Sequence, residues 1–341
     1  MTALTEVAAL LACPECGDTL QPDAAALRCG NRHSFDIARQ GYVGLLTGAS
    51  TKMTGDTAAM LDARAAFQGA GHFAPIAAAV AQAFGFVAEP EHTSHVPYSG
   101  PVSGVRPSGS ATSPDDTTPP DSAASPDKPG LPVNTGSPGG STTPRDAIGR
   151  AGGAVLEIGA GTGYYLAQLL DAHPRTLGIA LDVAKPAARR AARAHPRLAS
   201  ILADAWRGLP IRDGALNGVL SVFAPRNPAE VARVLGPGGR FVVVTPTSRH
   251  LGELIEPLGM VRVDPDKDRR LEDALSGTFT RTDHTLVEFP MKLSRADVTN
   301  VVAMGPSAFH GTPADDPRIA ALADFTQVTA SVTVATYAPV G

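Results

Sequence analysis

The sequence predicts an α/β protein in which a mostly parallel sheet follows a small metal-binding domain. Three observations carry this prediction. From residue 152 onward, short apolar runs alternate with helical segments, which is typical of a parallel sheet with crossover helices on both faces. All three cysteines lie within the first 29 residues, and two of them are spaced C-x-x-C. Residues 90–148 separate the two parts and contain 12 of the 30 prolines.

The composition limits the class of protein. The chain has 341 residues, of which 43% are hydrophobic, and this is enough apolar material for a sizeable core and excludes a wholly disordered chain. It contains no stretch of about 18 apolar residues, so no membrane partner is expected. The first residues lack a basic segment and a signal-peptide cleavage pattern, and we therefore expect a cytoplasmic protein.

Residues 1–50 are predicted to form a zinc-binding ribbon. They contain the pattern C-x2-C-x12-C-x3-H, formed by Cys13, Cys16, Cys29 and His33. Three thiolates and one imidazole suit tetrahedral zinc and close its coordination shell, so the expected metal is one structural Zn²⁺. The alternatives are three unrelated buried cysteines or a redox C-x-x-C pair, and the latter lacks a surrounding βαβ pattern. Because zinc would engage every cysteine, covalent catalysis by a cysteine is disfavoured.

Residues 51–89 are predicted to be a helical connector. Apolar residues recur at helical spacing from Met60 to Phe67, and Asp56 is a candidate N-cap. Two glycines and Pro75 follow, and they should interrupt the helix.

Residues 90–148 are predicted to be a disordered insertion rich in Pro, Gly, Ser and Thr. Runs such as TSPDDTTPPDSAASPDKPG show almost no apolar periodicity, so they cannot bury enough surface to offset the entropy of ordering. The segment holds 6 acidic and 3 basic residues, whereas the whole chain has a net charge of −4. The rest of the chain is therefore nearly neutral, and its charge is only weak evidence against an RNA partner.

Residues 149–341 are predicted to form the α/β domain. Its strand candidates are AVLEIG, TLGIALD, SILAD, GVLSVFAP and FVVVTP, and its first helices are YYLAQLLDAH and KPAARRAARAHP. The first strand runs into a glycine-rich loop that opens a helix, and this loop contains Glu157, Gly159, Gly161 and Gly163. Glycines at such a position let the backbone turn sharply and approach a ligand closely.

Two further acidic residues follow neighbouring strands. Asp182 ends the second strand, where a carboxylate can accept hydrogen bonds from both hydroxyls of a ribose. Asp204 ends the third strand, where an adenine amino group would be recognised. Each of them could instead only cap the turn that follows. Glu157 would repel a pyrophosphate and favours a ligand with a cationic end. A dinucleotide enzyme is disfavoured further, because it needs G-x-G-x-x-G.

The order of these motifs resembles class I S-adenosylmethionine-dependent methyltransferases. The glycine loop and the two acidic residues are followed by Gly-Pro-Gly-Gly at residues 236–239, just before FVVV. The resemblance implies a Rossmann-like domain with a mostly parallel seven-stranded sheet. It also implies S-adenosylmethionine (SAM) as the methyl donor.

Longer blocks resemble the 23S rRNA (guanine-N1)-methyltransferases of the RlmA/TlrB type. They include CPECGDTLQPDAAALRCGNRHSFDIARQGYVGLL, GDTAAMLDARAAFQGAGHFAPI, VFAPRNPAEVARVL and VVAMGPSAFH, and they cover essentially the whole chain except the Pro-rich segment. VFAPRNP and VAMGPS look most like the branch that confers tylosin-type macrolide resistance. The resemblance implies methylation of N1 of a guanine in a domain II hairpin loop that lines the peptide exit tunnel. The implied partners are 23S rRNA or a ribosome assembly intermediate, and a second copy in a homodimer.

The resemblance also assigns roles to individual residues. The four ligands of the N-terminal pattern match the zinc ligands of the family. The residues matched to the cofactor site, or placed beside it by the glycine loop, are Phe73, Gly161, Thr162, Gly163, Tyr164 and His250. Phe73 stands where the family usually has Tyr, which removes a hydroxyl and keeps the ring. His250 alone would more often be structural, and its motif SRHLGEL favours a role near the cofactor.

The reaction sets requirements that the sequence meets only in part. Guanine N1 carries a proton at neutral pH, so a base or a group that stabilises charge at O6 is needed. The sequence does not identify that group. Basic residues offer RNA contacts in the ribbon, at Arg28, Arg32 and Arg39, and in a stripe over residues 185–197. A SAM-dependent methyltransferase acting on a small molecule or on another RNA is the alternative function.

Overall fold

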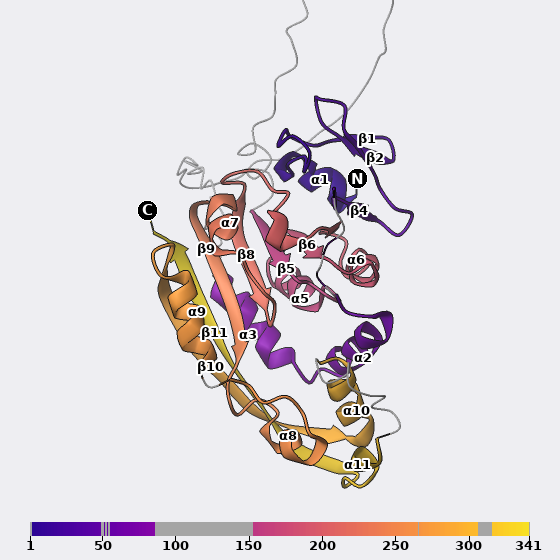
Figure 1. Ribbon diagram of the computed structural model, residues 1–341, viewed down its shortest axis with the longest axis vertical. Coiled ribbons are helices and arrows are strands. Elements are labelled where there is room, and N and C mark those ends of the chain that lie inside the picture. Colours follow the sequence, from indigo (N-terminus) through magenta and orange to yellow (C-terminus); the bar gives the residue numbers. More distant parts are fainter. Residues whose placement is uncertain are drawn as a thin grey trace, which may run out of the picture. The chain divides into compact units, whose positions relative to one another are not determined.

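The computed structural model describes residues 2–48, 51, 53, 55–85, 153–264, 266–305 and 316–340. The predicted insertion at 90–148 lies outside the described residues. Within them, a central sheet carries helices on both faces, and the N-terminal segment packs beside one end of the sheet (Figure 1). None of the helices in this part of the chain is long and apolar enough to cross a membrane.

The main sheet has eight strands in the order β10-β11-β9-β8-β5-β6-β7-β4. Its strands are β4 (Tyr42–Gly44), β5 (Ala154–Ile158), β6 (Leu177–Asp182), β7 (Leu198–Leu202), β8 (Leu216–Val222), β9 (Leu235–Pro246), β10 (Phe279–Ser294) and β11 (Phe325–Pro339). Strands from β4 across to β9 run parallel, and β11 pairs antiparallel with both β9 and β10. The domain itself therefore supplies the seven mostly parallel strands that were predicted, and β4 is an eighth, unpredicted strand from the N-terminal segment.

Two apolar cores lie on the two faces of this sheet. Alternate residues of a strand point to opposite faces, so Leu156 and Ile158 join one core and Val155 joins the other. The first face is covered by α1 (Ala3–Val7), α7 (Pro228–Val234) and α9 (Lys267–Leu275). The second is covered by α3 (Ala74–Phe84), α5 (Tyr164–Ala172), α8 (Gly252–Leu258) and α10 (Arg295–Ala303). The remaining helices are η1 (Ala8–Leu10), α2 (Ala58–Gly69), α6 (Lys185–Ala191), η2 (Ala205–Arg207) and α11 (Pro317–Ala320).

The N-terminal segment forms a small sheet of its own and also extends the main one. Strands β1 (Gln21–Asp23), β2 (Ala26–Arg28) and β3 (Ser34–Asp36) pair antiparallel. Beside them, Leu11 forms a β-bridge with Ile211, and the Arg212 N–H donates to the carbonyl of Leu10. Backbone pairing thus joins the N-terminal segment to the loop that follows β7.

The connector folds as two helices with the predicted break between them. A helix over residues 58–69 and a second one over 74–84 are confirmed, and Pro75 occupies the first turn of the second, where its missing N–H costs nothing. The predicted N-cap at Asp56 is wrong. Thr57 caps the helix by accepting a hydrogen bond from the Met60 N–H at 3.2 Å, while the Asp56 carboxylate pairs with Arg64.

Candidate active site and zinc centre

Four side chains of the N-terminal segment converge on one point. The potential ligand atoms of Cys13, Cys16, Cys29 and His33 all lie within 4.8 Å of one another. The Cys16 and Cys29 sulfurs are 3.8 Å apart, and the Nδ1 atom of His33 lies 3.4 Å from the Cys29 sulfur and 3.6 Å from that of Cys13. A tetrahedral zinc with Zn–S bonds of about 2.3 Å requires sulfurs about 3.8 Å apart. The donor set therefore fits one structural zinc.

Local structure supports these ligands. Gly17 follows the second cysteine with φ at +75°, and its N–H donates to the carbonyl of Cys13 at 2.7 Å, which closes the knuckle. The Asn31 side chain donates to the Cys16 sulfur at 3.4 Å and helps to lower the pKa of this exposed thiol to about 6. A hydrogen bond of this kind favours the thiolate that a metal requires.

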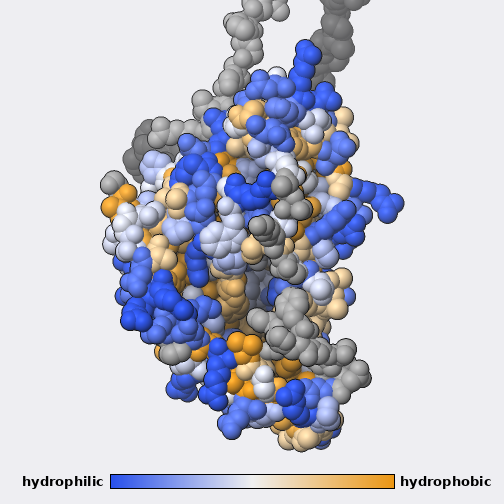
Figure 2. All heavy atoms as spheres, in the orientation of Figure 1, coloured by the Kyte–Doolittle hydropathy of each residue, from blue (hydrophilic) through white to orange (hydrophobic). Residues whose placement is uncertain are grey.

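A cavity of about 730 Å³ opens at the carboxyl ends of the parallel strands. Its wall includes residues that follow β5, β6, β7, β8 and β9, together with residues of α2 and the end of α10. Figure 2 shows a recess near the middle of this face with hydrophobic residues on its walls. Large apolar side chains at the cavity remain exposed, among them Met53, Trp206, Phe223 and Val261. An apolar recess at this edge of a parallel sheet is where ligands bind in α/β proteins.

The glycine loop shapes one wall of this cavity. Gly159 lies in the wall with φ at +68°, and a Cβ there would come within 2.7 Å of the Cβ of Ala224. Gly163 has φ at +76°, and a Cβ there would lie 3.0 Å from the Cβ of Ala194. Both positions therefore require glycine for conformation and for space. Gly161 and Gly163 are outside the cavity lining, so their contact with the cofactor stays a prediction.

Glu157 is a buried acid in the wall of the cavity. Only 1% of the residue is exposed, and one carboxylate oxygen accepts a hydrogen bond from the Leu166 N–H at 3.2 Å. Burial, with a smaller contribution from nearby Asp182, raises the pKa of Glu157 to about 8. The charge of Arg64 lowers this pKa only in part. A buried carboxyl of this kind suits a ligand that brings a positive charge of its own.

The other two predicted acids also reach the cavity, and both already accept hydrogen bonds. Asp182 accepts from the backbone N–H groups of Gly161 and Ala184, each at 2.8 Å. Asp204 accepts from the Trp206 N–H at 3.0 Å and from the Thr51 hydroxyl at 2.6 Å. Asp204 thus caps η2 and lines the cavity at the same time. Carboxylate oxygens have further lone pairs, so these bonds leave room for a ribose hydroxyl or an adenine amino group.

The remaining predicted cofactor residues divide into two groups. Phe73 and His250 line the cavity, and their ring centroids are 6.0 Å apart. Thr162 and Tyr164 lie outside the lining. The Thr162 hydroxyl donates to the Gln68 side chain at 2.7 Å, and the Tyr164 ring packs edge-on against Tyr165.

Sequence reasoning assigned no cofactor role to some residues of the cavity. Arg64 pairs with Asp56, donates to the Met304 carbonyl at 2.9 Å and thereby ties α2 to the end of α10. Tyr165 lines the cavity, and among the described residues its buried hydroxyl lacks a hydrogen-bond partner. Trp206 is the chain's single tryptophan and is 52% exposed beside Asp204. Only the fold brings these residues to one place.

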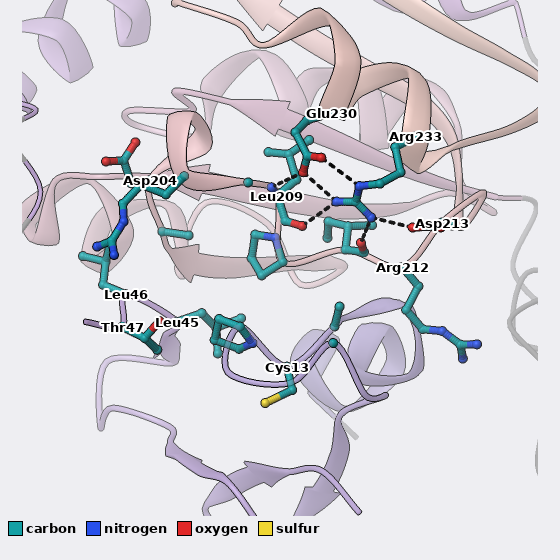
Figure 3. A pocket seen from close by; sticks show the side chains of 18 residues that line it. Cys13, Leu45, Leu46, Thr47, Asp204, Leu209, Arg212, Asp213, Glu230 and Arg233 are labelled. Atoms are coloured by element: carbon teal, nitrogen blue, oxygen red, sulfur yellow. Dashed lines mark hydrogen bonds and ion pairs between the residues drawn. The ribbon is translucent and has the colours of Figure 1, made fainter. Parts of the chain in front are cut away.

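A second pocket lies between the zinc-bearing segment and the loop after Asp204. Figure 3 shows Arg233 at its centre, held by dashed contacts to Glu230 and Asp213. The Arg233 guanidinium also donates to the carbonyls of Leu209 and Ile211, each at 2.8 Å. Because its donors are engaged within the protein, Arg233 fastens residues 209–213 to α7.

The predicted RNA-facing cations fall into two groups, those that contact other parts of the protein and those that are exposed. Arg28 pairs with Asp23 at 3.0 Å, Arg190 pairs with Asp62, and Arg197 donates to three backbone carbonyls. These three serve the fold. Arg28 is itself exposed, and the other exposed cations of the ribbon and the stripe are Arg32, Arg39, Lys185, Arg189 and Arg193.

The cavity combines acids for a cationic nucleoside, a glycine loop and an open apolar mouth for an acceptor. That combination defines a class I SAM-dependent methyltransferase, and a structural zinc centre accompanies it. The N-terminal residues 11–50 match the family described as "RlmA, N-terminal", and residues 155–239 match "Methyltransferase domain".

Two curated relatives match over almost their whole length. A Micromonospora griseorubida protein named as a 23S rRNA (guanine-N1)-methyltransferase is 43% identical, over 97% of both chains. The 23S rRNA (guanine(748)-N1)-methyltransferase of Streptomyces fradiae is 38% identical, over 95% of this chain and 94% of its own. The chain therefore belongs to the family of 23S rRNA (guanine-N1)-methyltransferases, and it is an enzyme.

Proposed function

We propose that the protein transfers a methyl group from SAM to N1 of a guanine in the domain II hairpin loop of 23S rRNA that lines the peptide exit tunnel. The observation that carries this proposal is sequence identity of 38–43% to two relatives along nearly the entire chain, zinc segment included. The position given in the name of the S. fradiae relative, guanine 748, is the specific target proposed here. Methylation there would confer tylosin-type macrolide resistance.

The cavity supports this proposal by dividing into an acidic and an open part. Glu157, Asp182 and Asp204 all line the cavity. In the proposal, Glu157 contacts the cationic methionine end of SAM, Asp182 the ribose and Asp204 the adenine. These roles, together with contacts from the glycine loop, Phe73 and His250, are part of the proposal. SAM supplies an activated methyl group, and the protein holds acceptor and donor collinear. Guanine N1 lies on the Watson–Crick edge, so a loop base must leave its stack to enter the cavity.

The zinc-bearing segment would present RNA to this cavity. Arg32 and Arg39 extend from it into solvent, and backbone pairing holds it against the loop after Asp204. We propose residues 1–50 as the RNA-recognition ribbon, 51–89 as the connector that completes the SAM site and 149–341 as the catalytic domain. The substrate is 23S rRNA or an assembly intermediate in the cytoplasm, and the enzyme is a homodimer, which light scattering would test.

Primer extension tests the target. Unmodified 23S rRNA is incubated with SAM and the zinc-loaded protein and then reverse-transcribed through domain II. N1-methylguanine cannot pair, so a SAM-dependent stop is expected at one loop guanine. A stop at another guanine would correct the position, and label transfer to a small molecule without any stop would support the alternative function. Expression in a tylosin-sensitive host should raise the inhibitory concentration of tylosin only when the stop is present.

A further inference from the structure

Lys267 occupies an unfavourable position in the wall of the cavity. It is the first residue of α9, where the helix dipole disfavours a cation, and its side chain is half-buried. Among the described residues it has no ion-pair or hydrogen-bond partner. Burial and the nearby charge of Arg226 lower the pKa of Lys267. The helix dipole, burial and the charge of Arg226 thus all disfavour a cation at this position. A charged group kept in so unfavourable a place is typical of a functional site, where a protein gives up local stability for chemistry.

The groups around Lys267 leave its ammonium available to a ligand. Asp268 attracts it, and the Asp268 carboxylate also accepts a hydrogen bond from the Thr245 hydroxyl at 3.1 Å. Arg270 lines the same cavity but is paired with Asp264. The Arg226 guanidinium has a buried Nη1 atom without a hydrogen-bond partner in the described part of the chain, which adds positive charge behind Lys267.

Two aromatic rings, those of Phe223 and His250, line the same cavity as Lys267. Phe223 is 42% exposed in the cavity wall and has φ at +54°, a conformation that is unfavourable for a bulky residue. Its ring centroid lies 5.8 Å from that of His250. The Nδ1 atom of His250 accepts the Ser331 N–H at 3.1 Å, so the neutral ring carries its proton on Nε2. Burial and Lys267 lower the pKa of His250 to about 4, which keeps the ring neutral at physiological pH.

These residues lie on the side of the cavity away from the predicted nucleoside site. Phe223 follows β8, and His250 and Lys267 follow β9, whereas Asp182 and Asp204 follow β6 and β7 across β5. One side of the cavity is therefore acidic and the other is cationic and aromatic. The cationic and aromatic side suits a flat, electron-rich base that acquires negative charge during the reaction.

Methylation of guanine at N1 requires that the base acquire negative charge. The N1–H bond breaks and the proton leaves to water, and the electron pair spreads over N1 and O6. N1 then forms a bond to the methyl carbon while the carbon–sulfur pair returns to sulfur, which leaves S-adenosylhomocysteine. A cation beside O6 stabilises the anionic base, and in a site shielded from water such a contact contributes about 10²–10³-fold to the rate.

We propose that Phe223 and Lys267 form the subsite for the target guanine, in which the base stacks on Phe223 and the Lys267 ammonium neutralises the charge on O6. His250, whose ring lies near both Phe73 and Phe223, borders this subsite and the cofactor site. This inference rests on the proposed function. Lys267 is then a catalytic residue, since it touches the reacting base, and Phe223 orients that base.

The test compares three variants of the full-length, zinc-loaded protein on a 23S rRNA transcript. Lys267→Met should lower kcat on the order of 100-fold and leave the SAM dissociation constant unchanged. Lys267→Arg keeps the charge and should recover most of kcat. Arg269→Met is the matched control, because Arg269 is on the same helix, is exposed and paired with Asp266, and lies outside the cavity lining. It should behave like the unaltered enzyme.

The pH profile separates stabilisation of O6 from a merely structural role. With Lys267 present, the bound guanine loses its proton at lower pH, so kcat should level off at lower pH than in Lys267→Met. A Lys267→Met variant with normal kcat would overturn the proposal. The proposal would also be overturned if Lys267→Met kept its kcat but had a higher KM for RNA, and if high salt removed this difference in KM. That result would show that Lys267 binds an RNA phosphate. If the unaltered enzyme forms no N1-methylguanine, the proposed function itself has failed.

Discussion

Glu157 offers a quantitative test of how the cavity is built. Its pKa rises from 4.5 to about 8 on folding, because burial of the carboxyl outweighs the opposing effects of one backbone donor and of the Arg64 charge. Between these two values the folded protein binds more protons at Glu157 than the unfolded chain does. Stability must therefore fall as pH rises through this window. Each pH unit costs about 1.4 kcal/mol, so the raised pKa of Glu157 lowers the stability of the SAM-free protein, relative to pH 4.5, by about 3 kcal/mol at pH 7 and about 5 kcal/mol above pH 8.

Glu157→Gln removes this cost and keeps an oxygen for the Leu166 N–H. The variant should match the unaltered protein in unfolding free energy near pH 4.5 and exceed it increasingly toward pH 8. Urea unfolding of both zinc-loaded proteins at four pH values measures the difference, and common effects of pH on the zinc ligands cancel. A difference that is independent of pH, or one that favours the unaltered protein at pH 8, would refute the reasoning.

Glu230 supplies a control of opposite sign. Its hydrogen bonds with Arg233 lower the pKa of Glu230, so its charged form stabilises the fold at neutral pH, and this stabilisation is lost as pH falls through the folded value. Glu230→Gln should therefore be less stable than the unaltered protein at pH 7 and approach it in acid.

Further predictions concern the zinc, the glycine loop, Arg233 and the cofactor. Cys16→Ala should bind less than one zinc per chain by metal analysis and bind SAM more weakly, because the zinc segment pairs with the loop after Asp204; a zinc-free protein with unaltered SAM affinity would contradict this. Gly159→Ala should lose SAM binding, since a Cβ would press on Ala224 and φ there is positive; calorimetry would show retained binding if the reasoning fails. Arg233→Met should cost about 1–3 kcal/mol in urea unfolding by leaving buried acceptors unpaired, and an unchanged midpoint would argue against this role of Arg233. SAM should alter the fluorescence of Trp206, and a titration without any change would place the cofactor elsewhere.

Local patterns predicted the first five strands and first two helices of the domain, because each of these carries its own signal, whereas the number of seven strands came from the family resemblance. The runs around Leu156, Ile179 and Val243 are apolar and bounded by turn residues, and all three lie in buried strands. The eighth strand, β4, escaped prediction because Tyr42–Gly44 is three residues long and becomes a strand only by pairing with β7. The N-cap went to Thr57 because the neighbouring Asp56 is engaged by Arg64, a tertiary contact.

The residues of the candidate site also fall into those that local sequence patterns predict and those that only the folded structure reveals. Cysteine spacing predicted the zinc ligands, because two of them share one tight turn and the other two lie in the connection between β2 and β3. The acids at strand ends were predictable because the sheet gathers them at one edge. Lys267 had no motif, and its significance depends on burial and on the absence of an ion pair within the described residues. Thr162 belongs to the matched loop, yet its hydroxyl is directed to Gln68.

The measurement that tests the central claim most directly is the identity of the methylated nucleoside. A 23S rRNA transcript is incubated with the zinc-loaded protein and SAM that carries a deuterated methyl group, and the digest is analysed by mass spectrometry. One deuterated N1-methylguanosine per transcript is expected, and it should be absent without SAM. Label at another base or another guanine atom, or an unlabelled transcript with full SAM binding, would contradict the account.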